Sequence, residues 1–165
     1  RFNIIFQTGN SDNGEDFIKL TDFKNQIADE KIKRRLSVFN FIGDELKDVF
    51  AVADLCVARS GAGTVCELIA LRIPAVFIPL AIATNNEQYK NAMIMKNMNS
   101  CIIIEEKQLN KTILLETLTD LFQTGQIKDM KRNLENIENF VGNKNVLELI
   151  LQCFKTGTDK ERSQG

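Results

Sequence analysis

Short runs of apolar residues alternate with longer stretches of helical periodicity along most of this chain. The continuous runs predict strands at residues 2–6, 36–42, 55–57, 74–79 and 101–104. Uniformly apolar strands are typical of a parallel sheet whose two faces are both covered. The alternation therefore predicts an α/β fold with a doubly wound, Rossmann-like parallel sheet, in which right-handed crossovers place helices on both faces.

The stretches between the strands predict the helices. They lie at residues 44–53, 64–71, 85–98, 111–122, 126–140 and 145–154, while residues 15–35 show a broken helical pattern. Asn85 or Asn86, and likewise Asn110, stand where a capping side chain is expected. Residues 1–155 suffice for one domain with a sizeable core, and we expect the polar tail at 156–165 to be disordered.

A glycine-bearing turn at residues 60–64 connects the third predicted strand to a helix. Its sequence is Ser60-Gly61-Ala62-Gly63-Thr64, and Arg59 precedes it. The backbone N–H groups at a helix start have no intrahelical acceptor and lie at the positive end of the helix dipole, which suits a phosphate or pyrophosphate. Glu67 follows about one turn later, where a carboxylate could accept hydrogen bonds from a ribose diol. The turn therefore predicts a nucleotide site.

Each of these features also has a purely structural interpretation. The turn could be only a tight strand-to-helix connection, and it lacks the GxGxxG fingerprint of NAD and FAD sites. Glu67 follows Thr64 by three residues, so the pair could form a capping box. Arg59 could be an ordinary surface residue, although a cation beside an anion-binding turn has an obvious role.

Further polar groups follow the other predicted strands, and all such turns share the carboxyl edge of a parallel sheet. Gln88 and Asn91 lie on one helix face, where neutral amides could pair with sugar hydroxyls, or they could simply belong to a polar helix start. The Ile42 backbone could contact a base edge, or its side chain could belong to the core. The Thr8 hydroxyl could reach a phosphate or a sugar.

Composition narrows the function classes. A net charge of −1 gives no general attraction to nucleic acid or to anionic membranes. The basic cluster at residues 31–35 is either a solvated helix end or a contact for anionic lipid. The longest apolar run, Ile73–Ala83, contains two prolines and is too short to span a bilayer.

The chain has four cysteines and no histidine. No two cysteines form a CxxC pair and no histidine could complete a zinc site, so we expect no zinc site, and we expect reduced thiols in a cytosolic protein. Without histidine, a general base must be Asp, Glu, Lys, Tyr89 or Cys, or must lie on another polypeptide or domain. Because the chain begins within a predicted strand and without methionine, we expect a fragment of a longer protein.

Taken together, these segments resemble the C-terminal half of the MurG family, the GlcNAc transferases of bacterial peptidoglycan synthesis in glycosyltransferase family 28. The matching series is Phe6–Gly9, Phe41–Ile42, Ala53–Leu55, Arg59–Ala62 with Thr64 and Glu67, Pro74, Pro79, Gln88–Tyr89 and Asn91–Ala92. Its order and spacing hold over most of residues 1–155. The dolichol-linked GlcNAc transferase subunit and diacylglycerol glycosyltransferases share parts of the series.

The resemblance implies a GT-B glycosyltransferase whose C-terminal domain binds UDP-GlcNAc. It places the Ile42 backbone at uracil, Thr8 near the diphosphate and Glu67 at the ribose hydroxyls. The turn Ala62-Gly63-Thr64 would hold the diphosphate and sugar, with Arg59 adjacent, and Ser60 and Gly61 also belong to the implied donor site. Gln88 and Asn91 would contact the GlcNAc hydroxyls. Glu87 departs from the family, where glutamine is usual. The family's histidine in the loop before that helix is also absent, and Ile82, Ala83 and Thr84 occupy this region.

The implied reaction is inverting transfer of GlcNAc to the lipid-linked MurNAc-pentapeptide, which converts lipid I to lipid II without a metal or other cofactor. In the family, the acceptor site, the membrane patch and the general base belong to the N-terminal domain. The resemblance therefore implies no catalytic residue in this chain, no nucleic-acid partner, and peripheral association of the complete protein with the inner face of the cell membrane. We expect this chain alone to bind the donor without transferring it.

Three other functions remain open at this point. A sugar-nucleotide epimerase domain would require an acid/base pair in its cleft, and the sequence shows no convincing pair. A donor-binding subunit of the dolichol type would have its missing half encoded separately. A regulatory nucleotide-binding domain would bind UDP-GlcNAc, UDP-glucose and UMP equally well.

Overall fold

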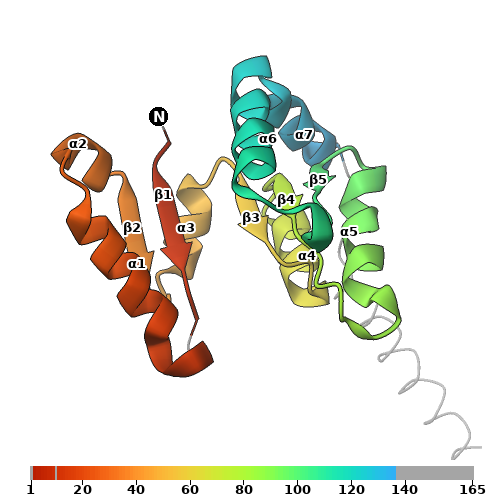
Figure 1. The fold of residues 1–165 in the computed structure, drawn as a ribbon. Helices are drawn as coiled ribbons and strands as arrows, with labels where there is room; N and C mark the ends of the chain where they lie inside the picture. Colours follow the sequence, from red (N-terminus) through yellow and green to blue (C-terminus); the bar gives the residue numbers. More distant parts are fainter. Residues whose placement is uncertain (1, 10, 137–165) are drawn as a thin grey trace, which may run out of the picture. The chain divides into compact units, whose positions relative to one another are not determined.

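A computed structural model of the chain describes residues 2–9 and 11–136 (Figure 1). The chain divides into two compact units, Arg1–Ala53 and Asp54–Gly165, and each is described by itself. The helix predicted at residues 145–154, the tail at 156–165 and Cys153 lie outside the described residues.

The first unit contains one parallel strand pair and its connecting helices. Its elements are β1 (Ile4–Gln7), η1 (Ser11–Gly14), α1 (Glu15–Gln26), α2 (Glu30–Lys33), β2 (Leu36–Phe39) and α3 (Leu46–Val52). β1 and β2 are parallel and in register from Ile4 opposite Leu36 to Gln7 opposite Phe39. The broken helical pattern at residues 15–35 is explained by two helices, and the Asp29 side chain caps the second by accepting from the N–H groups of Lys31 and Ile32.

Little of the first unit is buried. Every residue of β1 is exposed, with Ile4, Ile5 and Phe6 each more than 40% accessible, and among its described residues only Ile42 reaches the buried class. Within this unit taken by itself, β1 therefore has exposed side chains on both faces.

The second unit repeats a strand–helix alternation around a three-stranded sheet. Its elements are β3 (Cys56–Ala58), α4 (Ala62–Ala70), β4 (Ala75–Phe77), η2 (Thr84–Asn86), α5 (Glu87–Asn97), β5 (Cys101–Ile103), η3 (Glu106–Gln108), α6 (Lys111–Thr124) and α7 (Gln126–Glu135). The strand order is β3-β4-β5, and both pairings are parallel. The predicted α/β class with parallel strands is confirmed, and the described strands form two sheets.

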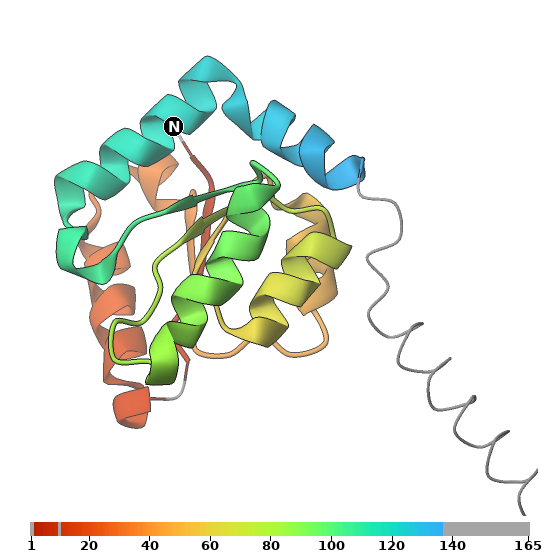
Figure 2. The same cartoon turned by 90° about the vertical axis from the view of Figure 1, so that its right-hand side faces the viewer.

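Helices cover both faces of the central strand of this sheet. All three residues of β4 are inaccessible. Val76 packs in one cluster with Leu121 of α6 and Met130 of α7. The flanking residues Ala75 and Phe77 point to the opposite face because side chains alternate along a strand. The helices α4 and α5 lie side by side (yellow and green in Figure 2), and α5 also packs against β5.

The helix caps match the sequence in part. Asn110 caps α6, because its Oδ1 accepts a hydrogen bond from the N–H of Ile113 at 2.9 Å. Asn86 holds the N-cap position of α5, but it adopts a left-handed conformation (φ 58°) and its side chain makes no capping hydrogen bond. The prediction for α5 thus has the right position and the wrong mechanism. Among the described residues, none of the helices has the length and apolar composition that a bilayer span requires.

The described cysteines differ in their expected reactivity. Cys56, Cys66 and Cys101 are free thiols, as predicted. Burial raises the pKa of Cys56 to about 11 and that of Cys101 to about 12, whereas Cys66 is exposed on α4. The thiolate is the reactive form, so a raised pKa means less thiolate at any pH below it.

We therefore expect iodoacetamide at about pH 8 to alkylate Cys66 at least about tenfold faster than Cys56 or Cys101 in the folded chain. Mass spectrometry of each cysteine-containing peptide measures the three rates. The same reaction in denaturant is the control, in which the rates should converge. Equal rates in the folded chain would contradict the burial of Cys56 and Cys101.

Candidate functional site

The glycine-bearing turn leaves the start of α4 open. The helix begins at Ala62, and its N-cap Gly61 has an extended backbone and provides no side-chain cap. The first intrahelical hydrogen bond runs from the N–H of Val65 to the carbonyl of Gly61, so the N–H groups of Ala62, Gly63 and Thr64 have no intrahelical acceptor. A Cβ atom on Gly61 or Gly63 would meet nothing within 4 Å. The turn therefore offers backbone donors and open space, as an anion site requires.

Glu67 lies on the second turn of α4 with its side chain exposed. The capping-box alternative is wrong, because the N-cap is Gly61 and not Thr64, and it makes no side-chain capping hydrogen bond. The helix starts two residues earlier than predicted, which moves Thr64 inside it. Within the part of the chain that the structure describes, the Glu67 carboxylate has no hydrogen-bond or ion-pair partner and can accept from a ligand.

Ser60, Gln88 and Asn91 are brought together between the turn and α5. The fully buried Ser60 hydroxyl donates to the carbonyl of Gln88 at 2.7 Å, and the Asn91 Nδ2 donates to the carbonyl of Ser60 at 3.2 Å. The N–H of Leu80, after β4, donates to Oε1 of Gln88 at 2.9 Å. These three bonds tie the turn after β3, the loop after β4 and the start of α5 into one assembly.

In this assembly, the side-chain amides of Gln88 and Asn91 each use only one of their two polar atoms. In the described structure, the hydrogen bonds of Gln88 and Asn91 leave Nε2 of Gln88 and Oδ1 of Asn91 without a partner. A hydroxyl group both donates and accepts, so these two atoms supply the complementary pair that a sugar needs. Sequence reasoning found both residues but missed their link through Ser60, which the sequence assigned to the ligand.

Arg59 belongs to a second network at the same sheet edge. Its Nη1 donates to the carbonyl of Ile78 at 3.0 Å, and its Nη2 pairs with Oε1 of Glu106. The other oxygen of Glu106 accepts from the N–H of Ala81 at 3.0 Å. The Ala81 hydrogen bond first, and the Arg59 hydrogen bond second, hold the pKa of Glu106 below its usual value. Glu106 was not predicted from the sequence, although it is a polar residue just after an apolar strand, the same pattern that indicated the other candidate residues.

Thr8 and Ile42 belong to the first unit. The Thr8 hydroxyl lies within 3.2 Å of the Gly9 carbonyl and 3.4 Å of the Phe39 carbonyl. The Ile42 side chain is buried, as the core interpretation predicted, and its N–H donates to Oε1 of Gln7 at 2.9 Å. The structure therefore groups Arg59, the turn, Gln88 and Asn91 in the second unit, while Thr8 and Ile42 are placed only within the first.

The described residues contain no group of three or more His, Cys, Asp or Glu side chains that could hold a metal ion. The chemistry that the second unit presents is a set of backbone N–H donors, one partly exposed guanidinium, one unpaired carboxylate and two half-used amides. Such a set can bind an anion flanked by hydroxyl-bearing groups.

Known proteins share this chain's sequence over most of its length. Residues 1–146 match the family described as "Glycosyltransferase family 28 C-terminal domain". A relative from a Sulfurihydrogenibium species is 31% identical over 120 residues, which cover 73% of this chain and 34% of the relative. One from Coxiella burnetii is 35% identical over 127 residues, covering 76% and 34%. Both are named UDP-N-acetylglucosamine--N-acetylmuramyl-(pentapeptide) pyrophosphoryl-undecaprenol N-acetylglucosamine transferase, and this chain spans about a third of their length.

A solved structure shares the fold. The crystal structure of Acinetobacter baumannii MurG matches with a TM-score of 0.74 at 25% identity, covering 91% of this chain and 41% of that protein. The match agrees with the parallel α/β architecture and with the GT-B half that the sequence resemblance implies. On the strength of the family match over residues 1–146, the chain belongs to glycosyltransferase family 28, as its C-terminal domain.

Proposed function

We propose that this chain binds UDP-GlcNAc as the donor half of an inverting glycosyltransferase that converts lipid I to lipid II in peptidoglycan synthesis. The single observation that carries the proposal is the open N-terminus of α4 with the unpaired Glu67 carboxylate one turn beyond it. The names of the relatives support UDP-GlcNAc as the donor and an undecaprenol-linked acceptor.

Each group has a role in donor binding. The N–H groups of residues 62–64 and the Arg59 guanidinium bind the diphosphate, and Glu67 accepts from the ribose hydroxyls. Gln88 and Asn91 contact the GlcNAc hydroxyls through Nε2 and Oδ1. In the first unit, Thr8 lies near the diphosphate and the Ile42 backbone contacts uracil. Because the Ile42 N–H is already bonded to Gln7, uracil must either displace that amide or bind the Ile42 carbonyl alone.

The groups in this chain stabilise the leaving group. As the bond between the sugar C1 and the diphosphate oxygen breaks, negative charge grows on the departing UDP. Backbone N–H groups and a guanidinium that are already oriented lower the energy of that charge, so the proposal requires no metal or other cofactor. The acceptor hydroxyl attacks C1 from the opposite face, which inverts its configuration, and the base that takes its proton lies in the N-terminal half of the complete protein.

The same proposal sets the partners and the location. The lipid-linked acceptor binds through the N-terminal domain, and the complete protein associates peripherally with the inner face of the cell membrane from the cytoplasm. Nucleic acid is not a partner, which agrees with a net charge of −1.

Calorimetric titration of the chain with UDP-GlcNAc, UDP-glucose, UDP and ADP tests the donor assignment. We expect the uridine ligands to bind, with UDP-GlcNAc preferred over UDP-glucose. ADP should bind at least about tenfold more weakly, because adenine cannot satisfy the polar groups of a site that pairs with uracil. Equal affinity for the two UDP-sugars would favour a regulatory nucleotide-binding domain. Preference for ADP would contradict the proposal.

We also expect the chain alone to show no GlcNAc transfer to a lipid-linked MurNAc-pentapeptide, because the acceptor site and the base lie elsewhere. The assay follows radiolabelled GlcNAc into the lipid fraction, with a complete family member as the positive control. Transfer above the level measured in a control without protein would show that this chain holds a general base. It would contradict the proposal that the acceptor site and the base lie in the N-terminal half.

A further inference from the structure

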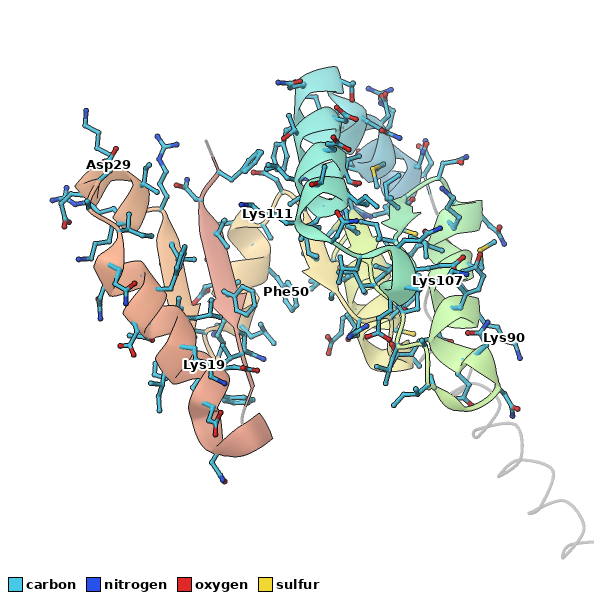
Figure 3. The ribbon with its side chains drawn as sticks, viewed as in Figure 1. Lys19, Asp29, Phe50, Lys90, Lys107 and Lys111 are labelled. Carbon is cyan, nitrogen blue, oxygen red and sulfur yellow. The ribbon has the colours of Figure 1, made fainter. Side chains whose placement is uncertain are left out.

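Glu106 joins the carboxyl ends of three neighbouring strands. Arg59 follows β3, Ile78 and Ala81 follow β4, and Glu106 opens η3 after β5, the turn where Lys107 is labelled in Figure 3. One carboxylate oxygen pairs with Arg59 and the other accepts from Ala81. Both oxygens of this single side chain are therefore used to connect the candidate donor site to the loop after the central strand.

The contacts fix the Arg59 guanidinium without exhausting it. Nη1 and Nη2 each make one hydrogen bond, to Ile78 and Glu106, and a planar group held at two points has a defined orientation. A guanidinium has five N–H donors, so three remain for a ligand. The Arg59 side chain is 47% exposed, so an anion can approach it from solvent.

Neighbouring charges do not share this role. Glu105, the residue before Glu106, pairs with Lys107 at 2.7 Å; the Lys107 side chain is largely exposed and that of Glu105 is partly exposed. Among the described ion pairs, Glu106 is thus the carboxylate that contacts Arg59. Glu105 consequently offers a matched control, since it has the same charge and lies one residue away.

We propose that Glu106 is a positioning residue that holds the Arg59 guanidinium in the orientation that the diphosphate of the donor needs. Glu106 itself does not contact the donor and acts through Arg59. The inference rests on the proposed function, because it assumes that the anion bound beside Arg59 is the diphosphate of a nucleotide.

An alternative role for Glu106 would have the opposite effect on the affinity for an anion. A carboxylate beside Arg59 also cancels part of its charge, and if that effect dominated, removing Glu106 would tighten the binding of an anion. Orientation dominates in our proposal because a misplaced guanidinium loses directed hydrogen bonds to phosphate, whereas an exposed charge pair is strongly screened by water.

The test compares UDP with uridine, which lacks the phosphates. We expect Glu106→Ala to weaken UDP binding by about 3- to 10-fold, the loss expected when a charge-assisted hydrogen bond is misaligned, and to leave uridine binding unchanged. Glu106→Gln keeps one acceptor oxygen, so its UDP affinity should lie between that of Glu106→Ala and that of the original chain. Glu105→Gln should bind both ligands normally. Calorimetry, with uridine at millimolar concentration, measures all of these affinities.

A double-mutant cycle separates positioning from a general structural effect. If Glu106 acts through Arg59, the Glu106→Ala change should have no further effect on UDP binding in an Arg59→Ala background. Additive losses, equal losses for uridine and UDP, or tighter UDP binding would each overturn the proposal. If the chain binds UDP but does not prefer UDP-GlcNAc over UDP-glucose, the proposed function is overturned and the cycle can still be interpreted. A chain that binds uridine but not UDP would overturn both the proposed function and the role of Glu106.

Discussion

Replacing Glu67 with alanine should weaken UDP-GlcNAc binding by at least about two orders of magnitude, with little effect on folding. In the proposed complex, the carboxylate accepts hydrogen bonds from both ribose hydroxyls. Bonds to a charged group are worth about 1.5–3 kcal/mol each, and about 1.4 kcal/mol corresponds to a factor of ten in affinity. Because the carboxylate is exposed and has no partner within the described residues, its removal breaks no contact of the folded chain.

Calorimetry on Glu67→Ala and Glu116→Ala separates this effect from a change in net charge. Glu116 is an exposed glutamate of α6 and is not among the proposed donor-binding residues, so Glu116→Ala should bind UDP-GlcNAc as the original chain does. A ligand with 2′-deoxyribose provides the second control. The original chain should discriminate against it, and Glu67→Ala should not. If Glu67→Ala keeps its affinity for UDP-GlcNAc, the proposed contact between Glu67 and the ribose is wrong, and the proposed function loses its main support.

The parts of the site that sequence reasoning found are those set by local chemistry. Apolar runs located β3, β4 and β5 to within a few residues. The reason is clearest for β4, which is buried on both faces and therefore needs a continuous apolar run. The glycine-bearing turn predicted the start of α4 to within two residues, and Asn110 marked the start of α6, since turn and cap preferences act over only a few residues. The uncapped helix start at this turn was therefore predictable from the sequence alone.

The parts that it missed depend on contacts between distant residues. Glu106 is 47 residues from Arg59, and Gln88 is 28 residues from Ser60, so no local pattern indicates either bond. Ser60 illustrates the consequence. Its place in the turn suggested a ligand contact, yet its buried hydroxyl donates to the chain itself, because a buried hydroxyl must find a partner.

Replacing Leu68 with alanine should destabilise the second unit by about 2–5 kcal/mol, the range for truncating a fully buried leucine. Leu68 is inaccessible on α4, the helix that carries both the turn and Glu67. The loss combines the transfer free energy of the removed methyl and methylene groups with the cost of the cavity that remains. Denaturant unfolding followed by circular dichroism measures the change.

Leu71→Ala is the matched control for this change, because Leu71 lies three residues away and is 50% exposed. It removes the same atoms and should cost less than about 1 kcal/mol, since most surface substitutions have small effects. The two variants also separate folding from binding. Under conditions where Leu68→Ala remains folded, its UDP-GlcNAc affinity should approach that of the original chain, because Leu68 supports α4 without facing the donor. Equal destabilisation by the two variants would show that α4 packs in another orientation, and Glu67 would then face a different surface from the one on which the donor site is built.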